Sequence, residues 1–259
     1  MQPFIRLALI AAAAAGLSAC GALHNARMWF PSASGMDEID ATLYVEPAMN
    51  AEQRRALQRQ IELGRAQVEA FYGSITTAPY FVACVTAPCA VRFGSYGELA
   101  TAFGDVAIRL SLHSFSLHRR LPQLVAHEWS HAELYRRVGG WRHIGKIPRW
   151  FDEGVAVVVA DESLHAPANW NEIARRGLPT PPLTELVSRR DWAAAVRKYG
   201  ETRGDDPSNL RVVYSTAGHE VRGFLARAGR AGVAAVLDAV QADEPFDAAY
   251  ARVGKNCVP

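Results

Sequence analysis

The chain has 259 residues, of which 49% are hydrophobic and 21% charged, and its formal net charge is +2. This composition excludes a largely disordered chain, because it supplies enough apolar side chains for the core of one domain or of two small ones. The near balance of charge offers no electrostatic footprint for nucleic acid, so we expect no nucleic-acid partner.

The first 20 residues have the anatomy of a secretory leader. Arg6 precedes an apolar run from Leu7 to Leu17, and small residues lead to Cys20. We therefore expect a signal peptide over residues 1–19 that is removed from the mature protein. The stretch LSAC at 17–20 also resembles a bacterial lipobox, which implies cleavage before Cys20 and acylation of its sulfur. An ordinary signal peptide with an incidental cysteine is the alternative.

No later apolar run approaches the roughly 20 residues that span a bilayer, so we expect an anchored protein that does not cross the membrane. Gly21 stands where the sorting rule for inner-membrane retention expects Asp. By that resemblance the protein belongs to the bacterial cell envelope, on the outer membrane and facing the periplasm. A small, polar composition then predicts a tether over residues 20–45. One domain is expected over 46–259, with a sheet and active-site helices to about 162 and a helical subdomain over 163–259.

An amphipathic helix is predicted from Asn50, as its cap, to Tyr72. Its apolar positions recur at helical spacing among Arg, Gln and Glu, and they are Leu57, Ile61, Val68 and Phe71. Strands are predicted at Tyr80–Val85, Cys89–Phe93 and Val106–Leu112, the last because apolar and polar residues alternate along it.

Three cysteines remain once Cys20 is set aside, an odd number for an oxidising compartment. Cys84 and Cys89 bracket four residues between two predicted strands, so we predict that they form a hairpin-closing disulfide. A metal site built on them would need a second cysteine pair, which the sequence lacks. Cys257 has no assigned partner.

The sequence HEWSH at residues 127–131 is an HExxH motif. Positions i and i+4 of a helix lie on one face, so His127 and His131 can reach one metal ion while Glu128 flanks it. Leucine, valine and alanine surround the motif at helix-like intervals, and Pro122 suits a first turn. The stretch therefore predicts a zinc site with a base on a buried helix.

A catalytic zinc ion usually has three protein ligands and an open fourth position. Downstream, Glu153 stands in an apolar helix-forming stretch that runs on through Val155–Ala160. An unpaired charge would be costly there, and a metal ion would compensate it. His143, between the two stretches, is the alternative third ligand.

The two stretches together resemble the gluzincin metallopeptidases, the thermolysin-like and aminopeptidase-like group in which HExxH is followed by WxxEGxA. The second motif is matched by Trp150, Glu153, Gly154 and Ala156. The resemblance implies one zinc ion bound by His127, His131 and Glu153, with Glu128 as general base and a peptide or protein as substrate. It also implies a zincin-like α+β fold, in which a small mixed or antiparallel sheet packs on the HExxH helix and a mostly helical subdomain follows. In that family an edge strand before this helix lines the cleft, which implies that role for residues 106–112.

Beyond the second motif the sequence is helical. The predicted helices are Trp170–Arg176, Leu183–Lys198, Val212–Ala228, Gly232–Gln241 and Phe246–Val253. Because strands come first and helices second, the order of elements also indicates an α+β fold.

Several side chains have two open interpretations. Tyr214 opens a predicted helix, and aminopeptidase-type gluzincins carry a tyrosine at a comparable place, which implies that it stabilises the oxyanion; a core tyrosine would look the same. His219 is the competing donor. Asp152 either orients a zinc-bound imidazole or is an ordinary first-turn carboxylate. Glu133 is expected at the surface of the motif helix.

The expected function is a membrane-anchored zinc peptidase that hydrolyses peptide bonds with activated water. The alternative is a non-enzymatic zinc-binding envelope lipoprotein that retains the same fold. The sequence leaves the substrate and the oligomeric state open.

Overall fold

The computed structural model describes residues 26–115, 120–199 and 210–255. The leader, Cys20 and Cys257 lie outside these ranges. The strands are β1 Asp37–Asp40, β2 Leu43–Val45, β3 Tyr80–Ala83, β4 Ala100–Phe103 and β5 Ala107–Leu110. The helices are α2 Ala51–Tyr72, α3 Ala87–Arg92, α4 Leu112–Phe115, α5 Leu121–Arg137, α6 Arg149–Ala160, α7 Pro167–Arg175, α8 Arg189–Lys198, α9 Val212–Gln241 and α10 Phe246–Lys255. No helix within the described ranges is long and apolar enough to cross a membrane.

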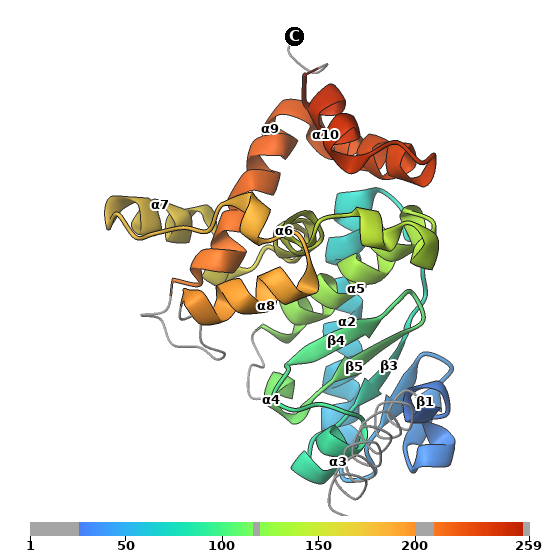
Figure 1. Cartoon of the computed structure of the whole chain (residues 1–259). Coiled ribbons are helices and arrows are strands. Elements are labelled where there is room, and N and C mark those ends of the chain that lie inside the picture. The colour runs from blue at the N-terminus through green and yellow to red at the C-terminus, as the bar shows by residue number, and fades with distance from the viewer. Residues whose placement is uncertain (1–25, 116–119, 200–209, 256–259) are drawn as a thin grey trace, which may run out of the picture.

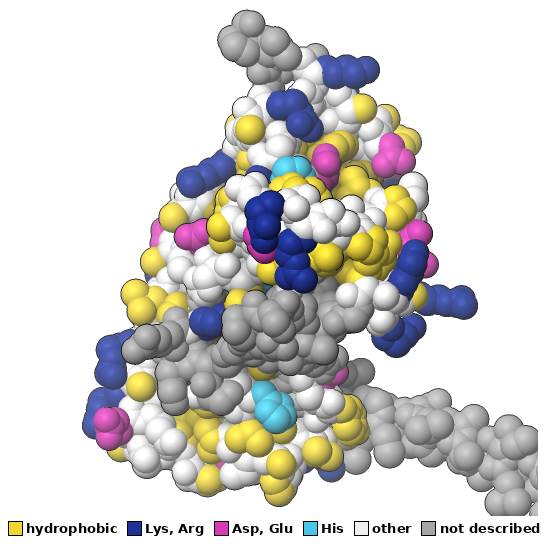
Figure 2. All heavy atoms as spheres, turned by 90° about the vertical axis from the view of Figure 1, so that its left-hand side faces the viewer, with side chains coloured by type: hydrophobic (Ala, Val, Ile, Leu, Met, Phe, Trp, Pro, Cys, Tyr) yellow, Lys and Arg dark blue, Asp and Glu magenta, His cyan; other side chains and the backbone are white. Residues whose placement is uncertain are grey.

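One five-stranded mixed sheet occupies the lower half of the molecule in Figure 1, and α6 to α10 lie above it. Its strand order is β1-β2-β3-β5-β4, with antiparallel pairs at both ends and parallel pairs in the middle. The α+β expectation is therefore confirmed. Figure 2 shows the side that carries α7 and α8, where basic, acidic and hydrophobic side chains are interspersed.

The two faces of the sheet are buried by different parts of the chain. One face packs on α2 and α5 through Leu43, Val45, Phe81, Ala83, Ile108 and Leu110. The other face carries Val82, Cys84 and Ala107, and it is covered by Met28, Met36 and Phe93. This division follows from the strand period of two, which sends successive side chains to opposite faces.

Helix α2 begins with the predicted cap. The Asn50 side chain accepts from Gln53 N, the Gln53 side chain accepts from Asn50 N, and Gly73 ends the helix at a φ of 76°. Its buried residues form one stripe, as predicted, and are Leu57, Ile61, Gly64, Val68 and Phe71. This stripe packs on α5, the helix that carries the HExxH motif.

Gly64 lets α2 approach α5 closely. A Cβ atom at this position would lie 2.5 Å from Val125 Cγ1 and 2.7 Å from the Pro122 carbonyl oxygen. We expect Gly64→Ala to lower the free energy of unfolding by about 1–3 kcal/mol, because the overpacking outweighs the helix propensity of alanine. Gly145→Ala, where a Cβ would meet nothing within 4 Å, is the control. Urea denaturation of both variants measures the difference, and equal stabilities would contradict the close approach.

Helix α6 is buried in the helical half and packs against α9. A Cβ on Gly154 would lie 2.5 Å from the Ala217 carbonyl oxygen of α9, so the glycine of the second motif permits this contact. Helix α6 has no side-chain cap, and its first amides, Arg149 N and Trp150 N, donate instead to the carbonyls of Val187 and Leu186. The start of α6 is therefore held by the segment that precedes α8.

Three sequence predictions about strands and linkers are wrong. The prediction of a tether over 20–45 is wrong from residue 26 onward, because Met28 and Met36 are buried and residues 37–45 contain β1 and β2. The strand at Cys89–Phe93 is instead the helix α3, with Thr86 as its cap. Residues 106–112 are not an edge strand, because β5 lies between β3 and β4. The edge strand next to α5 is β4, which the sequence analysis missed.

The C-terminal helices are confirmed with small changes. The predicted helix Leu183–Lys198 is a 3-10 turn at Leu183–Glu185 followed by α8, whose capping box at Ser188 and Asp191 starts a new helix. The two helices predicted over 212–241 form α9, interrupted at Gly229, which has a φ of 64° and a ψ of −176°.

Candidate metal centre

The HExxH motif lies in the middle of α5, and both of its histidines turn toward α6. The His127 and His131 rings lie with centroids 4.9 Å apart at an interplanar angle of 76°. Helix α5 is fixed on one side by α2 and on the other by α6, so its histidines are held in place by packing. The i and i+4 spacing therefore brings the two imidazoles together as predicted.

Glu153 approaches the two histidines from α6. Its Oε2 lies 3.2 Å from His127 Nε2 and 3.7 Å from His131 Nε2, and one ligand atom from each residue lies within 4.8 Å of the others. Zinc bonds of about 2.0–2.1 Å in tetrahedral geometry put ligand atoms about 3.3 Å apart. The three side chains therefore fit a metal ion of zinc's size, and all are buried or nearly so.

The Nδ1 atom of each imidazole, on the side away from Glu153, contacts a further carboxylate. Glu162 Oε1 lies 2.6 Å from His127 Nδ1, and Asp152 Oδ1 lies 2.6 Å from His131 Nδ1. An ionised carboxylate can only accept, so each Nδ1–H donates to its carboxylate. The Nε2 atom of each ring faces Glu153, where it carries a proton when no metal is bound and would offer its lone pair to a metal ion. Carboxylate-bound imidazoles of this kind are typical of metal ligands. Asp152 thus has the orienting position, one of its two open interpretations, and Glu162 was missed by the sequence analysis.

Arg149 joins the two carboxylates of α6. Its guanidinium group donates to Asp152 Oδ2 and to Glu153 Oε1, the oxygen that faces away from the histidines. Burial by itself raises the pKa of Glu153, but the Arg149 charge and the hydrogen bonds of the histidines hold this pKa well below its usual value. Glu153 is therefore ionised, with one oxygen anchored and the other directed at His127 and His131.

The charge of the carboxylates also acts on the histidines. Burial by itself lowers the pKa of His127, but Glu162 and Glu153 raise it well above its usual value. Burial also lowers the pKa of His131, but the charges of Asp152 and Glu153 outweigh it and raise this pKa to about 9. Protons and a metal ion thus compete for the same imidazole nitrogens.

Zinc binding should therefore depend on pH. Because the pKa of His131 is raised to about 9, its protonated form stabilises the metal-free fold fully below pH 6.5, and this contribution is lost as pH rises through about 9. The raised pKa of His127 acts in the same direction. Since a metal ion must displace these protons, we expect the affinity for zinc, used as the probe, to rise over the same window. Competition titration with a zinc chelator from pH 6 to 9 measures this. A pH-independent dissociation constant would contradict the assignment of the histidines.

A cleft of about 520 Å³ opens over one side of this centre. Its walls include His127 and Glu128 of α5, Ala100 of β4, and Tyr214 of α9. Glu128 Oε2 accepts a hydrogen bond of 2.8 Å from Ala102 N, which orients the carboxylate beside the edge strand. The predicted base therefore lies in the cleft wall next to a histidine of the centre.

Of the two predicted oxyanion donors, Tyr214 and His219, only Tyr214 lies at the cleft. Tyr214 lines the cleft, and its ring stacks on His165 at 5.1 Å and lies 6.4 Å from the ring of His127. His219 is exposed and stacks on Trp170 at 4.1 Å, so it does not line the cleft. His143 is also remote, since it pairs with Asp243 near the C-terminal end of α9.

His165 is a cleft residue that the sequence analysis did not consider. Its Nε2 lies 3.1 Å from Glu162 Oε2, so Glu162 connects it to His127. Burial lowers the pKa of His165 despite the opposing charge of Glu162. The only sequence signal was a carboxylate and a histidine three residues apart just after the second motif.

Glu133 is buried, which corrects the prediction that it is a surface residue. It is 0% exposed, and its carboxylate accepts from the backbone and hydroxyl groups of Thr76 and Thr77 at 2.7–2.8 Å. Arg137 Nε donates to it as well, at 3.0 Å. Glu133 thus fixes the loop after α2 to the motif helix.

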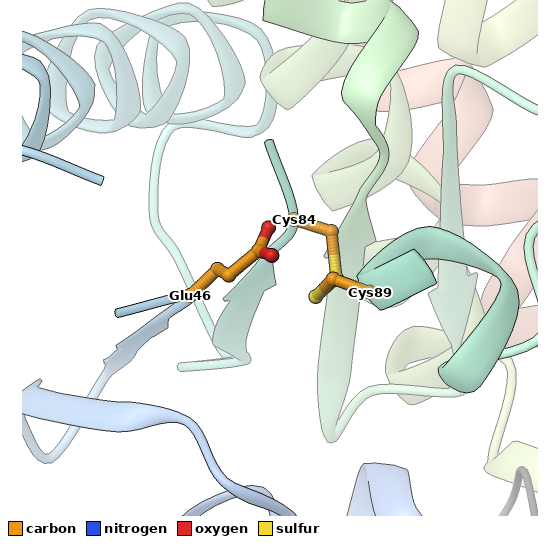
Figure 3. A group of neighbouring side chains, drawn as sticks. All are labelled: Glu46, Cys84 and Cys89. Atoms are coloured by element: carbon orange, nitrogen blue, oxygen red, sulfur yellow. A yellow bond between two sulfur atoms is a disulfide. The ribbon is translucent and has the colours of Figure 1, made fainter. Parts of the chain in front are cut away.

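Glu46, Cys84 and Cys89 form a second cluster of potential ligands (Figure 3). The two sulfur atoms are joined in the predicted disulfide, although it links the residue that follows β3 to α3 and does not close a hairpin. The Glu46 carboxylate accepts from Val85 N and from Thr86 N, so its oxygens hold the turn before α3. Bonded sulfurs offer no thiolate ligand, and the cluster is structural.

The contact between Glu162 and His127 can be tested directly. We expect Glu162→Gln to weaken zinc binding by about 10- to 100-fold, because an amide of equal size does not hold the Nδ1–H as a carboxylate does. The control is Glu172→Gln, at a surface carboxylate that pairs with Arg175. Chelator competition gives the affinities, and an unchanged affinity in Glu162→Gln would show that the contact does not support the metal.

Comparison with known protein families finds no matching family, and comparison with curated proteins finds no significantly similar sequence. The two motifs and the arrangement of the side chains therefore carry the functional argument.

Proposed function

We propose that the protein is a zinc-dependent peptidase of the gluzincin type. The observation that carries the proposal is the convergence of three ligand atoms, from His127, His131 and Glu153, with each imidazole held by a further carboxylate. A site built only for structure would be closed, whereas His127 and Glu128 both line an open cleft.

A zinc ion bound by these three side chains would polarise the substrate carbonyl and make the attacking water more acidic. Glu128 accepts the proton of that water and later returns it to the leaving amine. Its hydrogen bond from Ala102 N keeps the carboxylate directed along the cleft wall. Tyr214, which also lines the cleft, donates to the oxygen on which negative charge develops.

The substrate is an extended peptide that lies along β4. Among the described residues this strand is the outermost of the sheet beside α5, and Ala100 faces the cleft, while the amide of Ala102 is already bonded to Glu128. An unpaired edge binds a peptide by main-chain hydrogen bonds and is tolerant of its sequence. We therefore assign to β4 the peptide-binding edge that the resemblance implied for residues 106–112.

We also propose that Cys20 is acylated and anchors the protein to the outer membrane, on its periplasmic side. The lipobox-like sequence at 17–20 supports the anchor, and the Cys84–Cys89 disulfide supports an oxidising compartment.

The proposal is tested by measuring the zinc content of the purified protein together with cleavage of a mixed peptide library. We expect about one zinc ion per chain and cleavage that a chelator abolishes and added zinc restores. Bound zinc without cleavage would favour the non-enzymatic alternative. A protein that binds no zinc would exclude both.

A further inference from the structure

The exposed hydrophobic side chains of the described residues are unevenly distributed. Three of the seven large ones belong to two segments that contact each other, the segment before β1 and α3, and they are Trp29, Phe30 and Val91, with exposed fractions of 59%, 67% and 49%. Arg27 and Arg92 lie among them, and both line a shallow hollow with Phe30. We call these five residues the N-terminal aromatic surface.

The backbone under this surface is held firmly. Met28 is buried against the sheet, and its carbonyl accepts from the Tyr80 hydroxyl at 2.5 Å. The Arg27 guanidinium donates to the Arg92 carbonyl at 2.9 Å, which ties the segment to α3. Trp29 and Phe30 therefore stay exposed although their neighbour Met28 is buried, and exposed aromatic side chains gathered in this way mark a surface for a partner.

The position of the surface in the chain indicates which partner it meets. Only residues 21–25 separate Cys20 from the described segment, and the six steps from Cys20 to residue 26 span at most about 20 Å when the chain is extended. A lipid on Cys20 would thus keep the surface within about 20 Å of the membrane. Tryptophan and phenylalanine are favoured at the boundary between lipid headgroups and acyl chains, and arginine pairs with lipid phosphates.

We propose that the N-terminal aromatic surface lies against the phospholipid bilayer, with Trp29 and Phe30 in the headgroup region and Arg27 and Arg92 at the phosphates. The inference rests on the acylation of Cys20 proposed above. In Figure 1, α3 is at the lower end of the molecule, while β4 and α8, which line the cleft, lie above it. The docked protein therefore keeps its cleft away from the lipid.

The test uses the acylated full-length protein in vesicles of phosphatidylethanolamine and phosphatidylglycerol with brominated acyl chains, which quench nearby tryptophan fluorescence. Trp29 is one of six tryptophans. We expect quenching in the wild type, its loss in Trp29→Phe and no change in Trp141→Phe. Trp141 is the matched control because it is 76% exposed but lies in the 3-10 turn Gly140–Arg142, next to His143, which pairs with Asp243 at the C-terminal end of α9. Equal quenching in wild type and Trp29→Phe would overturn the proposal.

Two further measurements separate the possible failures. Mass spectrometry of the N-terminal peptide shows whether Cys20 is acylated. If it is not, the unmodified protein is mixed with the same vesicles, and an absence of Trp29-dependent quenching there again overturns the proposal that this surface binds the bilayer. A Trp29→Ala/Phe30→Ala variant is compared with wild type by size-exclusion chromatography. If the wild type is a dimer that this variant dissociates, and Trp29 is not quenched, a second copy of the chain is the partner. Thermal melting of the double variant confirms that it folds, as expected for two exposed side chains.

Discussion

Glu128→Gln should lower peptide cleavage by at least about 100-fold while zinc stays bound, because general-base catalysis typically contributes 10²- to 10⁴-fold. Glutamine has the size of glutamate, and its amide oxygen can accept the same hydrogen bond from Ala102 N. It cannot accept the proton of the attacking water. Since Glu128 is not one of the three clustered ligands, the loss should fall on turnover and leave metal affinity unchanged.

The experiment compares the initial rate of cleavage, the zinc content and the melting temperature of both proteins. Glu185→Gln is the control for loss of a carboxylate, because Glu185 pairs with Lys198 at the surface. Wild-type rates in Glu128→Gln would show that another group is the base. If neither protein cleaves any peptide while both hold zinc, the result favours the non-enzymatic alternative.

Replacing both motif histidines with alanine should remove the metal. His127→Ala/His131→Ala leaves only Glu153 of the three ligands, and one carboxylate anchored by Arg149 cannot retain zinc through purification. Metal binding also stabilises the fold, by about 2.7 kcal/mol when free zinc is 100 times its dissociation constant. We therefore expect zinc to raise the melting temperature of the wild type and to leave that of the double variant unchanged.

The matched control is His143→Ala/His219→Ala, which removes two histidines that lie outside the centre. Elemental analysis after dialysis measures the zinc content of each protein. The buried carboxylates Glu162 and Asp152 each lose one partner in the first variant, so His131→Gln serves as a milder change if the double variant is unstable. Near-stoichiometric zinc in folded His127→Ala/His131→Ala would exclude the proposed ligands.

The features that the sequence determined are those set by neighbours along the chain. Helix α2 with its Asn50 cap, the helical spacing of His127 and His131, and the Cys84–Cys89 disulfide all depend on short separations. A period of 3.6 residues or a loop of six residues is visible in one stretch of sequence. The α+β order of elements was visible for the same reason.

Tertiary structure decided which distant groups meet. Glu162 lies 35 residues from His127, and it reaches the imidazole only because α6 ends beside α5. Glu133 looks like a surface residue in its helix, but residues 76 and 77 supply the donors that a buried carboxylate requires. Such partners are set by how the helices pack, which no local pattern records.

The sheet shows the same division. Strand β4 has four residues of which two are alanine, so its pattern is weak, and pairing with β5 decides its role as the edge beside Glu128. Residues 32–35 have the small, polar composition of a tether, yet Met28 and Met36 on either side of them fill the second face of the sheet. The composition of a segment indicates whether it could remain exposed to solvent. Whether it is buried depends on whether another part of the fold has an apolar face that no other element covers.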